Sequence, residues 1–98
     1  MESFCISVIT PTHNRGKLLW RLYESISKQT YRDFEWLIVD DGSTDDTRRV
    51  IEEQILKDAN NKHLKVRYVY KNNGGKHTAV NKGVRLANGE LIFIADSD

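Results

Sequence analysis

The stretch Phe34-Glu35-Trp36-Leu37-Ile38-Val39-Asp40-Asp41-Gly42-Ser43 decides the fold. Its apolar half is typical of a short buried strand, and its polar half of a turn. The apolar residues that follow have the spacing of one helix face, and they are Val50, Ile51, Ile55 and Leu56. Ser43 and Asp46 have the spacing of a capping box, which predicts that this helix begins near Ser43.

The same order of strand, loop and helix precedes this stretch. Ile6–Thr10 predicts a strand that Pro11 should end, because proline cannot donate to a central ladder. A helix from about Lys17 to Gln29 is predicted by apolar residues at helical spacing. Beyond the central unit, Asn60-Asn61-Lys62 is interpreted as a loop.

The pattern then occurs once more. Val66–Tyr70 predicts a third strand, and Asn72-Asn73-Gly74-Gly75 a loop before a helix that Asn88-Gly89 should stop. Leu91–Ala95 predicts a fourth strand. An order of βαβαβαβ with short apolar strands favours one α/β domain, a Rossmann-like parallel sheet with helices on both faces.

Composition excludes several classes of partner. Of the 98 residues, 15 are Lys or Arg and 14 are Asp or Glu, so the net charge of +1 gives no reason to expect nucleic acid or a membrane surface. Cys5 is the single cysteine, which excludes an internal disulfide and favours a reducing compartment. With no leader and no long apolar run, we expect a cytoplasmic location, with the parent protein peripheral to the inner face of a membrane as an option.

Polar residues follow each predicted strand, where the ligands of parallel sheets bind. The four groups are Thr10 to Lys17, Asp40 to Ser43, Asn73 to His77, and Asp96-Ser97-Asp98. Asp96 and Asp98 are two positions apart on an extended chain, so both carboxylates point the same way and could hold a divalent cation. Neither a dinucleotide-binding G-x-G-x-x-G nor a P-loop follows the first strand.

These four groups together resemble the N-terminal half of a family 2 glycosyltransferase of the GT-A fold. The motifs that carry the resemblance are Pro11-Thr12-His13-Asn14-Arg15, Val39-Asp40-Asp41-Gly42-Ser43 and the terminal Asp-x-Asp. The resemblance covers the whole chain. It implies a strand order of 3-2-1-4, an incomplete GT-A sheet in which residues 1–98 form the nucleotide-sugar-binding half, and a missing acceptor half.

The implied activity is that of a hexosyltransferase in, for example, polysaccharide biosynthesis. A sugar would pass with inversion from a nucleotide diphosphate, usually UDP, to a saccharide or lipid-linked acceptor. Thr10, Pro11, Thr12 and Asp41 would surround the uracil, and the Asp41 carboxylate would accept from the ring N–H. Asp40 is interpreted as a helix-capping residue.

The metal would be Mg²⁺ or Mn²⁺, between which oxygen ligands do not decide. By resemblance, Asp98 would be the direct ligand, and Asp96 a ribose contact or second ligand. Asn14 would join the nucleotide site. The diphosphate contact stays open among Arg15, Lys76 and His77, helped by free N–H groups of Gly74-Gly75, because Val80 stands where many family members have an arginine.

No residue of the chain is a credible catalytic base, so we expect one beyond residue 98 and expect these residues alone to be inactive. The alternative is a non-catalytic nucleotide-binding or partner-binding α/β module. Leu91–Ala95 should lie at an open edge of the sheet, where pairing with a second copy would make a homodimer.

Overall fold

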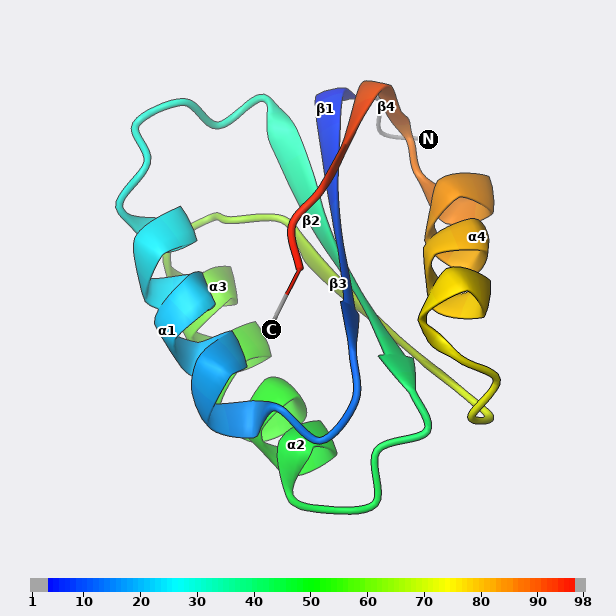
Figure 1. The fold of residues 1–98 in the computed structure, drawn as a ribbon. Helices are drawn as coiled ribbons and strands as arrows, with labels where there is room; N and C mark the ends of the chain where they lie inside the picture. Colours follow the sequence, from blue (N-terminus) through cyan, green and yellow to red (C-terminus); the bar gives the residue numbers. More distant parts are fainter. Residues whose placement is uncertain (1–3, 97–98) are drawn as a thin grey trace.

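The four apolar runs form the four strands of one parallel sheet (Figure 1). The computed structural model describes residues 4–96. The strands are β1 (Phe4–Thr12), β2 (Phe34–Asp41), β3 (Val66–Lys71) and β4 (Gly89–Ile94). Their order is β3-β2-β1-β4, so the predicted sheet and its strand order are confirmed.

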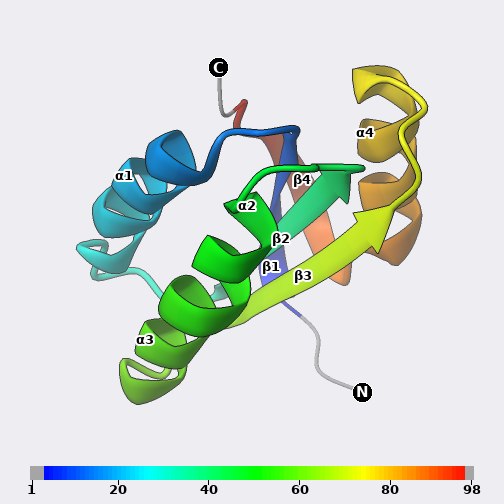
Figure 2. The same cartoon turned by 90° about the horizontal axis from the view of Figure 1, so that it is seen from below.

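Helices cover both faces of the sheet (Figures 1 and 2). On one face lie α1 (Gly16–Ser27) and a longer helical segment made of α2 (Thr47–Arg49), the π-helical η1 (Val50–Ile55) and α3 (Leu56–Asn61). On the other face lies α4 (Lys76–Leu86). The predicted two-sided covering is confirmed.

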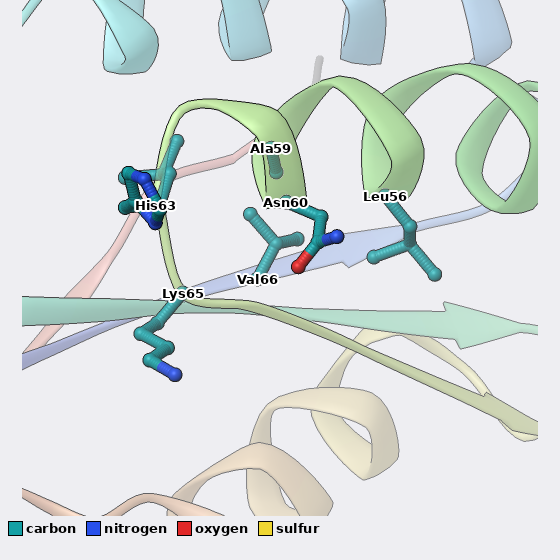
Figure 3. Close-up of a pocket in the computed structure, with 7 residues that line it drawn as sticks. Leu56, Ala59, Asn60, His63, Lys65 and Val66 are labelled. Carbon is teal, nitrogen blue, oxygen red and sulfur yellow. The ribbon is translucent and has the colours of Figure 1, made fainter.

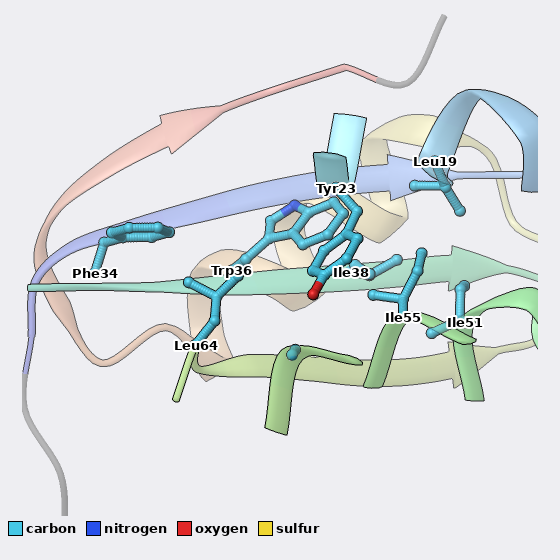
Figure 4. Close-up of a cluster of buried hydrophobic side chains, with 9 residues drawn as sticks. Leu19, Tyr23, Phe34, Trp36, Ile38, Ile51, Ile55 and Leu64 are labelled. Carbon is cyan, nitrogen blue, oxygen red and sulfur yellow. The ribbon is translucent and has the colours of Figure 1, made fainter. Parts of the chain in front are cut away.

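Successive side chains of β2 point to opposite faces of the sheet, so this strand contributes to two separate hydrophobic clusters. Beneath α1, η1 and α3, Trp36 packs against Tyr23, with ring centroids 6.2 Å apart (Figure 4). The rest of that cluster is Leu19, Phe34, Ile38, Ile51, Ile55, Ala59 and Leu64. Beneath α4, Leu37 and Val39 pack with Ile9 and Ala79.

Pro11 does not end the first strand, which continues to Thr12 in register with β2. The carbonyl oxygen of Ile9 accepts a hydrogen bond from the Ala95 N–H, so the backbone of Ile9 faces β4. By alternation Pro11 faces the same side, beyond Ile94, the last residue of β4. The ladder therefore loses no bond at the proline.

Two predicted helix boundaries are also wrong. The helix after β2 begins at Thr47 and not near Ser43, and its first N–H bonds the Asp45 carboxylate at 2.9 Å. Asn60 and Asn61 belong to α3 and not to a loop. Helix α3 ends at Asn61 with Lys62 as its C-cap. The next residue, His63, has a φ of +56°, the Leu64 N–H bonds the Ala59 carbonyl oxygen and the His63 N–H bonds that of Asn60, which is a Schellman motif without glycine.

Strand β4 lies at the edge of the described sheet, as expected. Leu91 and Phe93 are 56% and 59% exposed. A homodimer through this edge stays a prediction.

A hollow of about 540 Å³ lies beside the start of β3, at the opposite end from the strand carboxyl ends (Figure 3). It contains none of the predicted site residues; its lining is Leu56, Ala59, Asn60, His63, Leu64, Lys65 and Val66. None of the helices within residues 4–96 has the length and apolarity that a membrane crossing requires.

Candidate functional site

The loops that follow β1, β2 and β3 leave the sheet at one end (Figure 1). Parallel strands bring their carboxyl ends to the same edge, and the three loops are joined there by side-chain hydrogen bonds. The predicted gathering of polar loops is therefore present in the described residues.

Asp41 is the centre of this network. Its side chain accepts from Lys71 Nζ at 2.8 Å and from the N–H groups of Gly74 and Gly75, each at 2.9 Å. Asp41 is 5% exposed. Burial alone would raise the pKa of its carboxyl, but these three donors lower it by more, so the pKa lies below its usual value and the group is ionised at neutral pH.

The N–H groups of Gly74 and Gly75 are thus not free for a diphosphate, contrary to expectation. A local reason is that Gly75 has a φ of +99°, which turns the loop back toward β2. Both N–H groups then point at the Asp41 carboxylate.

His13 and Asn14 connect the first loop to the second. His13 Nδ1 donates to the Asp41 carbonyl oxygen at 2.8 Å, which fixes the proton on Nδ1. Asn14, with a φ of +53°, donates its N–H to Ser43 Oγ and accepts from Thr44 N–H, each at 2.9 Å. Asn14 therefore shapes the site through protein contacts.

Asp40 lies on the other face of β2 and is fully buried. Its carboxylate accepts from Ser43 N–H at 2.9 Å and from Tyr68 Oη at 2.7 Å. Asp40 thus stabilises the turn after β2. It does not cap the helix, which begins four residues after Ser43.

Thr10, Pro11 and Thr12 are buried at the end of β1. The Thr10 hydroxyl accepts from Trp36 Nε1 at 2.8 Å, inside the cluster beneath α1. Thr10 therefore supports the floor of the site, and its side chain is occupied by a core contact.

The candidate phosphate and metal residues are at the surface. Lys76, at the start of α4, forms an ion pair with Asp96, which follows β4. Arg15 is exposed on the first loop, and His77 is exposed in the first turn of α4. Asp98 lies outside the described residues. Within residues 4–96 there is no cluster of three or more His, Cys, Asp or Glu side chains that could hold a metal ion.

Sequence reasoning missed Lys71 and Glu35. Lys71 is the last residue of β3 and contacts a residue 30 positions earlier, for which no local pattern exists. Glu35 lies at the opposite end of the sheet and accepts from Ser7 Oγ, Arg67 and Asn88 N–H. Burial would raise the pKa of Glu35, but these donors lower it below its usual value. Glu35 is a structural anchor between the strands.

Comparisons with known proteins agree with this arrangement. The family model described as glycosyl transferase family 2 matches residues 7–98. Glycosyltransferase GlyG of Streptococcus pneumoniae is 42% identical over 94 residues, which are 95% of this chain and 30% of GlyG.

Two solved structures share the fold. The Staphylococcus aureus TarS 1-349 complex with UDP-GlcNAc has a TM-score of 0.79 and 36% identity, covering 95% of this chain and 26% of that one. The mannosyltransferase PcManGT of Pyrobaculum calidifontis, in complex with GDP-Man and Mn²⁺, has a TM-score of 0.85 and 31% identity, covering 99% and 28%. The chain thus spans less than a third of the length of each of these relatives.

Proposed function

The chain belongs to glycosyltransferase family 2, and we propose that the whole protein transfers a sugar from a nucleotide-diphosphate sugar, with UDP as the nucleotide, to a saccharide or lipid-linked acceptor. In this proposal the transfer inverts the anomeric carbon and depends on a divalent cation. Residues 1–98 supply donor and metal binding.

The observation that carries the proposal is the convergence of three loops on the ionised Asp41 at the carboxyl end of the sheet. In parallel α/β sheets this edge binds ligands. The structural neighbours in complex with UDP-GlcNAc and with GDP-Man support a nucleotide-sugar donor.

The Asp41 carboxylate can accept one further hydrogen bond, from a nucleotide base. A carboxylate offers about four acceptor positions, and the structure gives this one three donors. A uracil ring N–H would supply the fourth, which supports UDP as the donor nucleotide. Guanine also carries a ring N–H, so the proposal needs a direct comparison of UDP with GDP.

The diphosphate and the metal would lie at the other side of the site. Asp96 is an exposed carboxylate that follows β4, and its contact with the Lys76 ammonium supports a role for it beside a cation. Oxygen ligands suit Mg²⁺ and Mn²⁺, and the neighbour PcManGT has Mn²⁺ bound. With Asp98 as second carboxylate, these residues would fit such an ion, which stabilises a leaving diphosphate.

Lys76, His77 and Arg15 are the exposed basic side chains at this end of the sheet that we propose as diphosphate contacts. Lys76 would exchange Asp96 for phosphate oxygens. A catalytic base is expected elsewhere in the whole protein, because an inverting transfer must deprotonate the acceptor hydroxyl.

The test is an amide NMR titration of the whole protein with UDP, GDP and ADP, each with and without Mg²⁺. Metal-dependent shifts at Asp41 and Gly75 with UDP, at lower concentration than with GDP or ADP, are expected. Asp41→Asn should weaken the UDP response, whereas Asp46→Asn, at an exposed carboxylate in the loop after β2, should not. A preference for ADP, or equal binding without any sugar transfer, would favour a non-catalytic binding module.

A second test uses the 98 residues alone. We expect them to bind UDP weakly or not at all and to transfer no sugar. Sugar transfer by these 98 residues alone would contradict the proposal that the catalytic base lies elsewhere in the whole protein.

A further inference from the structure

Lys71 is partly buried at the end of β3 and uses every donor of its ammonium group. Its side chain is 15% exposed. Nζ donates to Asp41 Oδ1 at 2.8 Å, to the Asn72 carbonyl oxygen at 2.6 Å and to Thr78 Oγ1 at 2.9 Å. The acceptors belong to β2, to the loop after β3 and to α4.

These contacts close into a ring of hydrogen bonds. Lys71 donates to Thr78 Oγ1, Thr78 donates to the Gly75 carbonyl oxygen at 2.6 Å, and Gly75 N–H donates to Asp41 Oδ2. Lys71 also donates to Asp41, which completes the ring. The ring fixes the Asp41 carboxylate and the turn before α4 with respect to each other.

The packing around the ring is tight. A methyl group added at Gly74 would lie 3.0 Å from Thr78 Oγ1 and 3.1 Å from Lys71 Nζ. The lysine ammonium therefore lies directly beneath the turn, in contact range of a side chain at position 74.

We propose that Lys71 is a positioning residue for nucleotide binding: it holds the Asp41 carboxylate and the Gly74-Gly75 turn in the arrangement that a uridine nucleotide meets. This inference rests on the proposed function. Lys71 does not act as a phosphate ligand, because its three donors are already used and its side chain is largely buried. Lys76, by contrast, is exposed at the surface.

The two roles predict different nucleotide dependence. A residue that positions the base contact lowers the affinity for uridine, which has no phosphate, as well as the affinities for UMP and UDP. A residue that acts only by binding phosphate leaves the affinity for uridine unchanged. Comparing the three ligands therefore separates positioning from direct contact.

The experiment measures the affinity of the whole protein for uridine, UMP and UDP by NMR titration, in the wild type and in Lys71→Met. We expect all three affinities to fall, and the affinity for uridine to fall by a factor of about five to ten, the size of one ordinary hydrogen bond. Lys71→Arg, which keeps the charge and donors, should recover part of the loss. Lys57→Met, at an exposed position on α3, is the matched control and should bind as the wild type does.

Hydrogen exchange of residues 72–78, measured without nucleotide by mass spectrometry, provides a readout that needs no ligand. Lys71→Met should accelerate exchange at Gly74 and Gly75, and Thr78→Val, which breaks the ring but keeps Lys71 beside Asp41, should do so to a smaller extent. Thr78→Val also serves if Lys71→Met does not fold.

Unchanged exchange in both variants, or a loss confined to UDP, would overturn the inference. If the wild type binds no uridine nucleotide, the proposed function fails, and the exchange data alone then decide whether Lys71 positions the turn.

Discussion

Replacing Asp41 by asparagine should destabilise the protein as well as weaken nucleotide binding. Oδ1 of Asp41 accepts from Lys71 and Gly74, and Oδ2 accepts from Gly75. An asparagine amide has one oxygen and one NH₂ group, so in either orientation the NH₂ group faces at least one donor. The variant therefore loses at least one hydrogen bond at a position that is 5% exposed.

The size of this destabilisation follows from the groups that donate to the Asp41 carboxylate. A hydrogen bond to a charged group contributes about 1.5–3 kcal/mol, and a buried donor left without a partner costs about 1–3 kcal/mol. The Lys71 side chain keeps 15% exposure, so water can solvate it in part. We expect Asp41→Asn to lower the free energy of unfolding at pH 7 by about 2–4 kcal/mol.

The pH dependence gives this prediction a second component. The pKa of Asp41 is lower in the folded state than in the unfolded chain, where an aspartate has a pKa of about 3.9. Its contribution is therefore complete above the unfolded pKa and is lost as the pH falls through the folded value. The difference between wild type and Asp41→Asn should shrink as the pH falls below about 4.

Urea denaturation followed by circular dichroism, from neutral pH to about pH 3, measures both components. Asp46→Asn is the control: the Asp46 side chain is 62% exposed and 3.9 Å from Arg49, so its loss should cost less than about 0.5 kcal/mol. A loss for Asp41→Asn below about 0.5 kcal/mol at pH 7, or a loss that does not change with pH, would refute the reasoning.

Three further predictions concern the base of the site, the metal and the opposite end of the sheet. Thr10→Val leaves the Trp36 indole N–H buried without its acceptor and should lower the free energy of unfolding by about 1–3 kcal/mol, measured by thermal denaturation. Thr10→Ser keeps the hydroxyl and should recover most of this loss. A loss of nucleotide affinity without a loss of stability would instead make Thr10 a direct base contact. Combined Asp96→Ala and Asp98→Ala substitutions should abolish the increase in UDP affinity that Mg²⁺ or Mn²⁺ produces in calorimetric titration, and an unchanged increase would place the metal elsewhere. Glu35→Gln, at a fully buried position with three donors, should cost about 2–4 kcal/mol in urea denaturation without affecting nucleotide affinity at a temperature where the variant is folded.

The strands, their order and the polar edge could be predicted because they depend on local patterns and on the family resemblance. The apolar runs at β2 and β4 are short and end in polar residues, which leaves few arrangements for a parallel sheet. Element ends were less predictable because distant partners decide them. Pro11 is accepted within β1 since β4 ends before it, and Ser43 bonds Asn14 instead of capping a helix.

The site was predictable only in part. The sequence predicts Asp41 as a nucleotide-binding residue, and the structure places it at the carboxyl edge of the sheet; its role in binding stays a prediction. The three groups that hold its carboxylate come from positions 30 to 34 residues later, which no spacing rule connects to it. The prediction that the Gly74 and Gly75 N–H groups face phosphate is wrong because of such a distant partner, the Asp41 carboxylate. The sequence shows a glycine turn before a helix, but not the direction in which the turn folds.

The direction of the turn before α4 connects the two sides of the proposed nucleotide site. Asp41 stabilises the turn before α4, and the same turn leads into Lys76 and His77, the proposed phosphate contacts. A nucleotide base that takes the fourth acceptor position of Asp41 would therefore act on a group already joined to the phosphate side of the site. Base recognition and phosphate positioning are then two effects of one hydrogen-bonded unit, since loosening the Lys71 ring would change both. A double-mutant cycle between Lys71→Met and Lys76→Met, read out as UDP affinity, tests this: strong non-additivity supports one unit, and additive losses within about 0.3 kcal/mol would show two independent contacts.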